Sequence, residues 1–127
     1  MGAERTDRGW LAVWLWLALQ LTLTSLPGKA IPVGLPHPVD WVGHFCMYGG
    51  LGALLARAAF FRGWRLKHLV WLGVALSAWA ALDELHQRFI PGRDCEVGDW
   101  AADTLGASLG LWVGTRLMTS RVARWLR

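Results

Sequence analysis

Four stretches of the sequence are almost entirely apolar, and polar residues gather in the short segments between them. The apolar stretches cover residues 10–26, 39–61, 66–90 and 97–118. A helix that crosses a bilayer needs roughly 17 to 25 mostly apolar residues, and each stretch has that length. Pro27-Gly28 and Pro91-Gly92 supply chain reversals. The pattern predicts an all-α, polytopic membrane protein, a compact bundle of four transmembrane helices in which neighbours are antiparallel.

Composition supports a membrane protein and argues against a nucleic-acid partner. Apolar residues make up 54% of the chain and charged residues only 17%, whereas soluble domains have about 25% charged residues. The net charge of +4 does not indicate a nucleic-acid partner, because the basic residues lie between and beyond the apolar stretches rather than in one patch. Cys46 and Cys95 match no metal or redox spacing. We therefore predict no nucleic-acid partner, no cofactor and no metal.

The positions of Lys and Arg predict the orientation. If both termini share one side of the membrane, that side holds ten of the 13 basic residues, and the other side holds Lys29, Arg88 and Arg93. Loops rich in Lys and Arg stay in the cytoplasm. The prediction is a multi-pass membrane protein with a cytoplasmic tail at residues 1–9, a membrane domain at 10–119 and a basic cytoplasmic tail at 120–127.

The first apolar stretch has an alternative interpretation. Arg5 and Arg8 precede it, and the small-residue segment Gly28-Lys29-Ala30 follows it, as in a cleaved signal peptide. An apolar core of about 7 to 15 residues is usual for a signal peptide, so this stretch is long for one. We favour a transmembrane helix.

Acidic and other polar residues concentrate at one predicted end of the bundle. Six of the nine acidic residues lie within residues 82–110, which the predicted topology places toward the outer surface. An ionisable group inside a bilayer is costly, so it usually faces protein or water and has a partner. In the second stretch, Asp40, His44 and Tyr48 recur every four residues and form one polar stripe. An N-terminal cap explains Asp40 alone but not all three residues.

The end of the third stretch carries a second polar group. Asp83, His86 and Gln87 share one face of a helix at spacings of three and four residues, and Glu84 lies one step round it, within reach of Gln87. A hydrated helix end near lipid headgroups is the alternative explanation for His86 and Arg88.

The fourth stretch begins with acids and continues as a glycine stripe. Asp99, Asp103, Gly106, Gly110 and Gly114 follow one another on one face. Small residues at intervals of four let helix backbones approach closely in lipid. The stripe serves either the core of the bundle, where it would draw the acidic helix ends together, or a homo-oligomer.

Arg93 lies in the turn between the third and fourth stretches, beside several carboxylates. We expect its guanidinium to contact Asp99, Glu84 or Asp40. It then acts either as a structural clamp or as a binding group for an anionic headgroup.

Three motifs, taken in order, resemble the VanZ-like family over residues 40–114. They are Asp40-x-x-x-His44-Phe45-x-x-Tyr48, Asp83-Glu84-Leu85-His86-Gln87-x-Phe89-x-Pro91-Gly92-Arg93 and Asp99-x-x-x-Asp103-Thr104-x-Gly106-Ala107. The resemblance implies a small bacterial integral membrane protein of a family named for a member that confers low-level teicoplanin resistance. Two positions depart from the family pattern, since Trp41 replaces a usual lysine and Asp103 a usual asparagine.

We hypothesise that the polar residues form an outward-facing site that binds or remodels a membrane lipid, a lipid-linked envelope precursor or a glycopeptide-type ligand, with the resemblance implying a link to antibiotic resistance. The candidate ligand-binding residues are Asp40, His44, Tyr48, Glu84, Gln87, Arg93, Asp99 and Asp103.

Two other classes of function fit the same residues. In an intramembrane hydrolase or transferase, His44 acts as general base, Glu84 or Asp99 as acid or orienting partner, and Arg93 stabilises negative charge. No nucleophile or zinc-protease motif supports an enzyme, and a metal set of Asp40, His44, Glu84 and Asp99 lacks a diagnostic spacing. In a structural scaffold or partner subunit, the polar groups only hold the helices in register.

Overall fold

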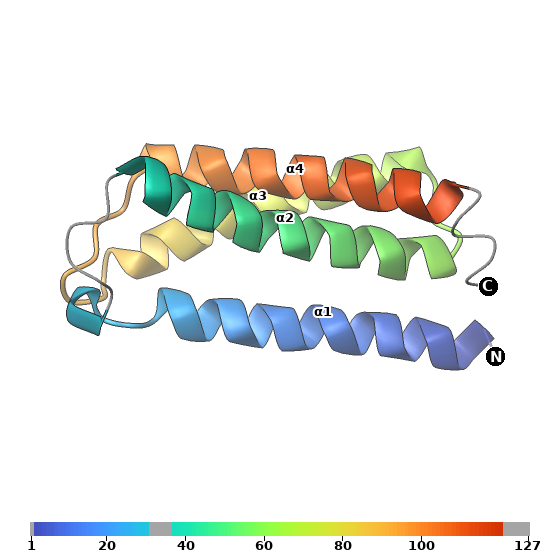
Figure 1. Cartoon of the computed structure of the whole chain (residues 1–127), viewed down its shortest axis with the longest axis horizontal. Coiled ribbons are helices and arrows are strands. Elements are labelled where there is room, and N and C mark those ends of the chain that lie inside the picture. Colours follow the sequence, from blue (N-terminus) through green and yellow to red (C-terminus); the bar gives the residue numbers. More distant parts are fainter. Residues whose placement is uncertain (1, 31–36, 121–127) are drawn as a thin grey trace.

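The computed structural model describes residues 2–30 and 37–120 of the chain. It contains α1 (Gly2–Thr24), the short 3-10 helix η1 (Gly28–Ala30), α2 (His37–Phe61), α3 (Leu66–Gln87) and α4 (Val97–Thr119), and the described residues include no strand (Figure 1). The predictions of an all-α fold and of four long helices are confirmed.

Two helix ends differ by more than two residues from the limits of the apolar stretches. α1 begins at Gly2, before the first apolar stretch, so the helix also includes residues 2–9. α3 ends at Gln87 and not at residue 90. Beyond Gln87, turn hydrogen bonds between residues three apart replace the helical ones. The Ile90 N–H, for example, donates to the Gln87 carbonyl oxygen at 2.9 Å. Pro91 cannot donate within a helix, and Gly92 has φ +75°, a conformation that favours glycine.

The glycine stripe of α4 packs against α2, and these two helices share the most extensive interface of the molecule. A Cβ atom on Gly106 would overlap the carbonyl oxygen of Phe45, and one on Gly110 would overlap that of Gly49. Only glycine permits backbones to lie this close. The stripe is therefore occupied within the chain, and a second copy could reach it only if α2 and α4 separated.

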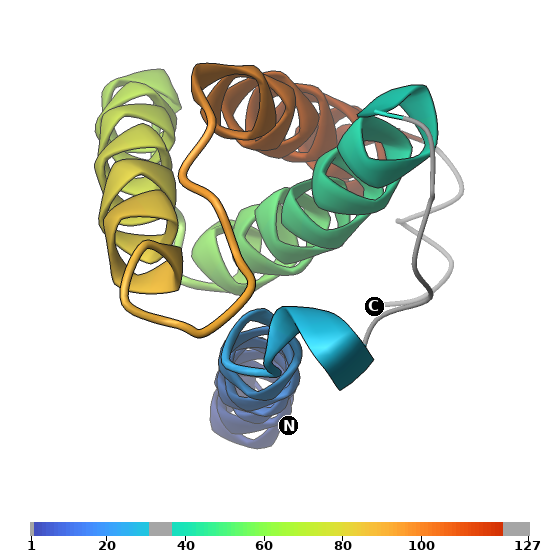
Figure 2. The same ribbon diagram turned by 90° about the vertical axis from the view of Figure 1, so that its left-hand side faces the viewer.

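α1 packs on α2 and lies apart from the α3–α4 pair (Figure 2). The Trp16 indole N–H donates to the Met47 carbonyl oxygen at 2.9 Å, and its ring lies against Gly50, where a Cβ atom would overlap it. Near the start of α1, the Trp10 and Trp64 rings meet edge to face with their centroids 6.3 Å apart. α1 thus contacts α2 through Trp16 and the turn after α2 through Trp10.

The short helix η1 and the loop at residues 88–96 lie together at the end of the molecule opposite the start of α1 (Figure 1). Gly28 N–H donates to the Pro91 carbonyl oxygen at 2.9 Å and joins these two segments. The same end contains the first turns of α2 and α4 and the last turn of α3. The polar residues of three helices therefore meet here, as the sequence predicted.

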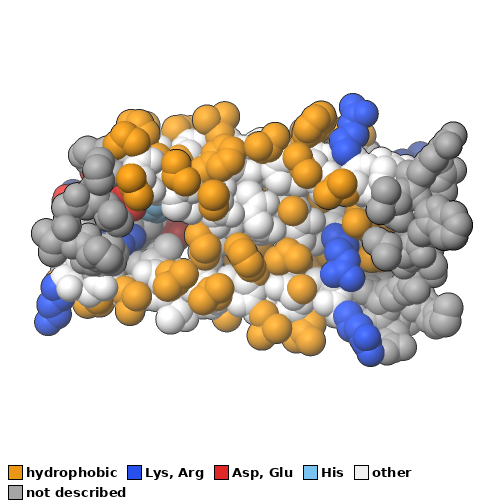
Figure 3. All heavy atoms as spheres, viewed as in Figure 1, with side chains coloured by type: hydrophobic (Ala, Val, Ile, Leu, Met, Phe, Trp, Pro, Cys, Tyr) orange, Lys and Arg blue, Asp and Glu red, His pale blue; other side chains and the backbone are white. Residues whose placement is uncertain are grey.

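Apolar side chains cover the outside of the bundle, while polar side chains are buried within it. Figure 3 shows hydrophobic side chains over the middle of the visible face, with Lys and Arg gathered toward the end where α1 begins. The buried polar residues are Gln20, Asp83, Glu84, Gln87, Asp99 and Asp103. Over the described ranges, none of the helices combines the length and apolar character that crossing a membrane requires. The prediction of four membrane-spanning helices is therefore not confirmed.

Candidate functional site

His44 of α2 lies at the centre of a group of carboxylates from three helices. Its Nδ1 lies 3.0 Å from Asp103 Oδ1 and 3.9 Å from Glu84 Oε1, and its Nε2 lies 3.8 Å from Asp99 Oδ2. The close α2–α4 contact at Gly106 places these side chains together. A carboxylate can only accept a hydrogen bond, so Nδ1 of the imidazole is the donor to Asp103. The nitrogen Nε2 is left facing Asp99.

Asp40 lies one helical turn before His44 and is exposed. Ligand atoms of Asp40, His44 and Asp99 all lie within 4.8 Å of one another, as do those of His44, Glu84 and Asp103. The two groups share His44. The imidazole is therefore surrounded by acidic groups on both of its nitrogen-bearing edges.

Glu84 and Gln87 belong to a hydrogen-bonded chain behind His44. Glu84 Oε2 accepts from the backbone N–H of Glu96 at 3.0 Å, and Glu84 Oε1 accepts from Gln87 Nε2 at 3.3 Å. Gln87 Oε1 in turn accepts from Arg93, through Nε at 3.1 Å and also through Nη2. These bonds tie the end of α3 to the start of α4.

The expectation that the Arg93 guanidinium contacts a carboxylate was wrong. Its hydrogen bonds go to the amide oxygen of Gln87. The turn after α3 is tight, with Arg93 N–H donating to the Ile90 carbonyl at 3.1 Å, and it folds the side chain back over the last helical residue. Glu84 is already bonded to Gln87 and to the Glu96 backbone.

Tyr48 and Asp83 form a separate pair deeper in the bundle. The Tyr48 hydroxyl donates to Asp83 Oδ2 at 3.2 Å, and both side chains are buried. By contrast, His86 and Arg88 are exposed, in accord with the hydrated helix end that was the alternative explanation for them. The buried polar face of α3 is therefore Asp83, Glu84 and Gln87, and the prediction that His86 shares the face of Asp83 and Gln87 was wrong.

A cavity of about 200 Å³ opens beside His44 between α1, α2 and the loop after α3. Its walls are Gln20, Leu23, Thr24, Leu26, Asp40, Gly43, His44, Met47, Tyr48 and Arg93. Four of the residues predicted as ligand-binding, Asp40, His44, Tyr48 and Arg93, therefore line the cavity. The other four, Glu84, Gln87, Asp99 and Asp103, do not line it. They contact the lining residues His44 and Arg93 instead.

Gln20 of α1 is a cavity residue that the sequence interpretation missed. It is only 1% exposed, and neither its Oε1 nor its Nε2 has a hydrogen-bond partner within the part of the chain that the structure describes. A buried amide without partners is costly. The signal in the sequence was the single amide side chain within the apolar stretch 10–26.

Three buried carboxylate oxygens also lack a hydrogen bond from any described residue. They are Oδ1 of Asp83, Oδ1 of Asp99 and Oδ2 of Asp103. Each of these carboxylates has its other oxygen directed at Tyr48 or His44. The described residues therefore leave one oxygen of each of these three carboxylates without a hydrogen bond.

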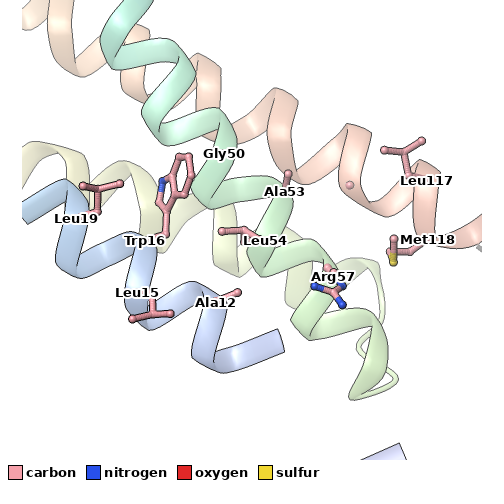
Figure 4. A pocket seen from close by; sticks show the side chains of 11 residues that line it. Ala12, Leu15, Trp16, Leu19, Gly50, Ala53, Leu54, Arg57, Leu117 and Met118 are labelled. Carbon is pink, nitrogen blue, oxygen red and sulfur yellow. The ribbon is translucent and has the colours of Figure 1, made fainter. Parts of the chain in front are cut away.

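A second hollow lies away from these polar groups, between α1, α2 and the end of α4 (Figure 4). It has a volume of about 640 Å³ and apolar walls that include Leu15, Trp16, Leu54 and Leu117. Arg57 is the charged residue in its lining. None of the predicted site residues contributes to it.

The model of one protein family, VanZ/LLP1, matches residues 9–118. The chain belongs to this family. Comparisons with curated proteins and with solved structures find no match. The VanZ/LLP1 match covers parts of all four helices and every residue of the cavity and of the network behind it.

The two departures from the VanZ-like pattern occupy different places in the site. Trp41 packs beside Gly98 at the start of α4, where a Cβ atom on that glycine would come within 2.9 Å of the indole nitrogen. Asp103 is fully buried and holds His44 Nδ1. In this member of the VanZ/LLP1 family, the residue at position 103 therefore orients the imidazole and adds a carboxylate to the site.

Proposed function

We propose that this VanZ/LLP1 protein is an integral membrane protein of the bacterial inner membrane that binds the polar head of an envelope lipid or lipid-linked precursor in the cavity beside His44. One observation carries the proposal. The cavity joins Asp40, His44 and Arg93 to the buried Gln20 amide, whose two polar atoms have no protein partner among the described residues. A ligand with both donor and acceptor groups would satisfy that amide.

The distribution of side chains supports a lipid environment. Large apolar side chains point outward along the bundle, among them Trp71 at 71% and Phe89 at 77% exposure. Extended apolar surface of this kind marks sites of contact with membranes or other proteins. The acidic side chains Asp83, Glu84 and Asp103 lower the average hydropathy of α3 and α4, but they are buried. The excess of Lys and Arg at the other end would place the cavity toward the outer leaflet.

The size and lining of the cavity suggest the chemistry of the ligand. A volume of about 200 Å³ suits a small polar head and not a whole glycolipid. Leu23, Leu26 and Met47 line the cavity and would contact the adjoining carbon atoms. Arg93 would meet a phosphate, while Asp40 would meet hydroxyl or amine groups. A purely anionic head is disfavoured by repulsion from the carboxylates around His44, so the head should carry donor groups as well.

Thermal unfolding of the purified full-length protein in detergent tests this proposal. The panel is phosphatidylethanolamine, phosphatidylglycerol, undecaprenyl phosphate and, for a glycopeptide-type ligand, teicoplanin. Binding to the folded state raises the unfolding temperature in a concentration-dependent manner. We expect at least one compound to do so, and we expect Gln20→Leu and Arg93→Ala to lose the response.

Arg88→Ala is the matched control, because Arg88 is an exposed arginine at the same end of α3. It should respond as the wild type does. An unchanged unfolding temperature across the whole panel, or the same response in wild type and Arg93→Ala, would count against a ligand site in this cavity.

A second proposal, an intramembrane hydrolase or transferase, is favoured by the His44–Asp103 pair. A carboxylate that fixes one imidazole nitrogen leaves the other available as a general base, and His44 lines the cavity. Asp99 lies nearer to Nε2 than Glu84, which is bonded elsewhere. Mass spectrometry of the compound that binds would follow its turnover. Loss of product in a folded His44→Gln variant supports catalysis, whereas an unchanged rate excludes His44 as the base.

A further inference from the structure

The imidazole of His44 is held in the arrangement typical of a metal ligand. Histidines that bind metals usually donate the other ring N–H to a carboxylate or carbonyl, which fixes the ring and its tautomer. His44 Nδ1 makes such a bond with the fully buried Asp103 at 3.0 Å. The other ring nitrogen, Nε2, faces Asp99, and ligand atoms of Asp40 lie on the same side. These two carboxylates are separated from each other along the sequence but adjacent in the fold.

The spacing of the ligand atoms suits a single ion. His44 Nε2 and Asp99 Oδ2 are 3.8 Å apart, and two atoms that are each about 2.1 Å from one ion can lie up to about 4.2 Å apart. Asp40 completes the group, with all three ligand atoms within 4.8 Å of one another. Because Asp40 is exposed, its side chain can move the remaining distance by changing rotamer.

Two further observations indicate that the buried polar groups around this site do not satisfy one another. Asp99 has a side chain only 7% exposed, and its Oδ1 has no hydrogen-bond partner in the described ranges. Gln20, which is only 1% exposed, lines the adjoining cavity, and neither of its polar side-chain atoms has a partner among the described residues. Burying a carboxylate is costly unless it is paired with another group or coordinates a metal.

We infer that Asp40, His44 and Asp99 bind one divalent transition-metal ion of the Zn²⁺ class, oriented by Asp103 and open to the cavity lined by Gln20 and Arg93. One nitrogen and two carboxylate ligands suit zinc, manganese or cobalt better than calcium or magnesium. Three protein ligands leave further positions on the ion for water or for an oxygen of a bound molecule.

The second triad, His44, Glu84 and Asp103, is a weaker alternative. Glu84 already accepts hydrogen bonds from Gln87 and from the Glu96 backbone, and Asp103 accepts from Nδ1. An ion there would have to displace these bonds. Among the described residues, an ion on the Nε2 side would displace no side-chain hydrogen bond of Asp40 or Asp99.

The inference goes beyond the proposed lipid site and holds whether or not a lipid binds. A metal on Nε2 would prevent that nitrogen from acting as a general base, so the metal site and the proposed catalytic role of His44 exclude each other. The ion would also add positive charge beside Arg93, in a cavity whose carboxylates otherwise repel a phosphate.

The full-length chain in detergent is first treated with a chelator, and the chelator is then removed. Calorimetry then follows titrations of this protein with Zn²⁺, Mn²⁺ and Mg²⁺. All variants carry Cys46→Ser and Cys95→Ser, because exposed thiols bind zinc by themselves. We expect one saturable Zn²⁺ site per chain, with Mg²⁺ far weaker. Asp99→Asn and His44→Gln should abolish it, and Asp103→Asn should weaken it by about 10- to 100-fold.

Matched controls are Asp94→Asn and His86→Gln, which replace an exposed acid and an exposed histidine at the same end. Both should bind as the parent does. Visible absorption of bound Co²⁺, sensitive to His44→Gln but not to His86→Gln, is a second readout that does not depend on stability. No saturable site, or a site that survives Asp99→Asn in a folded protein, would overturn the inference. Lipid titrations with and without chelator then separate this result from that of the lipid site.

Discussion

His44 Nδ1 lies 3.0 Å from Asp103 Oδ1 and so joins the first turns of α2 to the second turn of α4. The bond depends on the close approach of the two helices, which the glycine stripe of α4 permits. Asp103 is fully buried, so water cannot replace His44 as its partner. The site and the packing of the core are therefore coupled through this pair.

The coupling makes Asp103 important for stability. Asp103→Leu removes the acceptor of the buried Nδ1–H and should lower the free energy of unfolding by about 1–3 kcal/mol. Asp103→Asn keeps an oxygen acceptor of the same size and should cost less than about 1 kcal/mol. Chemical denaturation in detergent with a chelator present measures both. Equal losses in the two variants would mean that the hydrogen bond contributes little.

The α2–α4 interface should not accept a methyl group in the glycine stripe. A Cβ atom on Gly110 would overlap the Gly49 carbonyl oxygen, so Gly110→Ala must push the helices apart, at a cost of about 1–3 kcal/mol. Gly43→Ala is the control within α2, since a Cβ atom there meets nothing within 4 Å. Alanine at this helical position should raise stability by about 0.5–1 kcal/mol. Thermal unfolding of the two variants should shift in opposite directions.

The Tyr48–Asp83 pair should behave as a coupled unit. Tyr48→Phe leaves both oxygens of the buried Asp83 without a hydrogen bond and should cost about 1–3 kcal/mol. Replacing both partners by apolar groups is usually much less costly than leaving one unpaired. The double variant Tyr48→Phe/Asp83→Leu should therefore be more stable than the sum of the single losses implies. Additive losses in this double-mutant cycle would show that the two residues do not interact.

Gln20 should show opposite effects on stability and on binding. Gln20→Leu removes a buried amide whose polar atoms lack described partners, and it should raise the free energy of unfolding by about 1–3 kcal/mol. The same variant should lose the response to the ligand that wild type binds. Thr22→Val, at an exposed position of α1, should change neither property. Reduced stability of Gln20→Leu would show that the amide is satisfied in the folded protein.

The sequence was sufficient to predict the number and approximate limits of the helices. Apolar stretches of helical length, interrupted by Pro27-Gly28 and Pro91-Gly92, are local signals that do not depend on tertiary contacts. The same signals, together with an antiparallel arrangement, predicted that Asp40, Asp83 and Asp99 lie at one end of the molecule. The small-residue spacing of α4 correctly predicted close helix packing.

Tertiary structure decided which side chains meet, since a sequence does not fix the rotation of a helix about its axis or the path of a tight turn. Packing of α4 on α2 turned Asp103 toward His44, and the turn after α3 folded Arg93 onto Gln87 instead of a carboxylate. The docking of α1 made Gln20 part of the cavity. The sequence by itself determined that the polar residues share one end of the bundle. Only the packed helices determined that His44 is fixed by Asp103 and faces Asp99 with its free nitrogen, because such contacts depend on distances of a few ångströms between segments far apart in the chain.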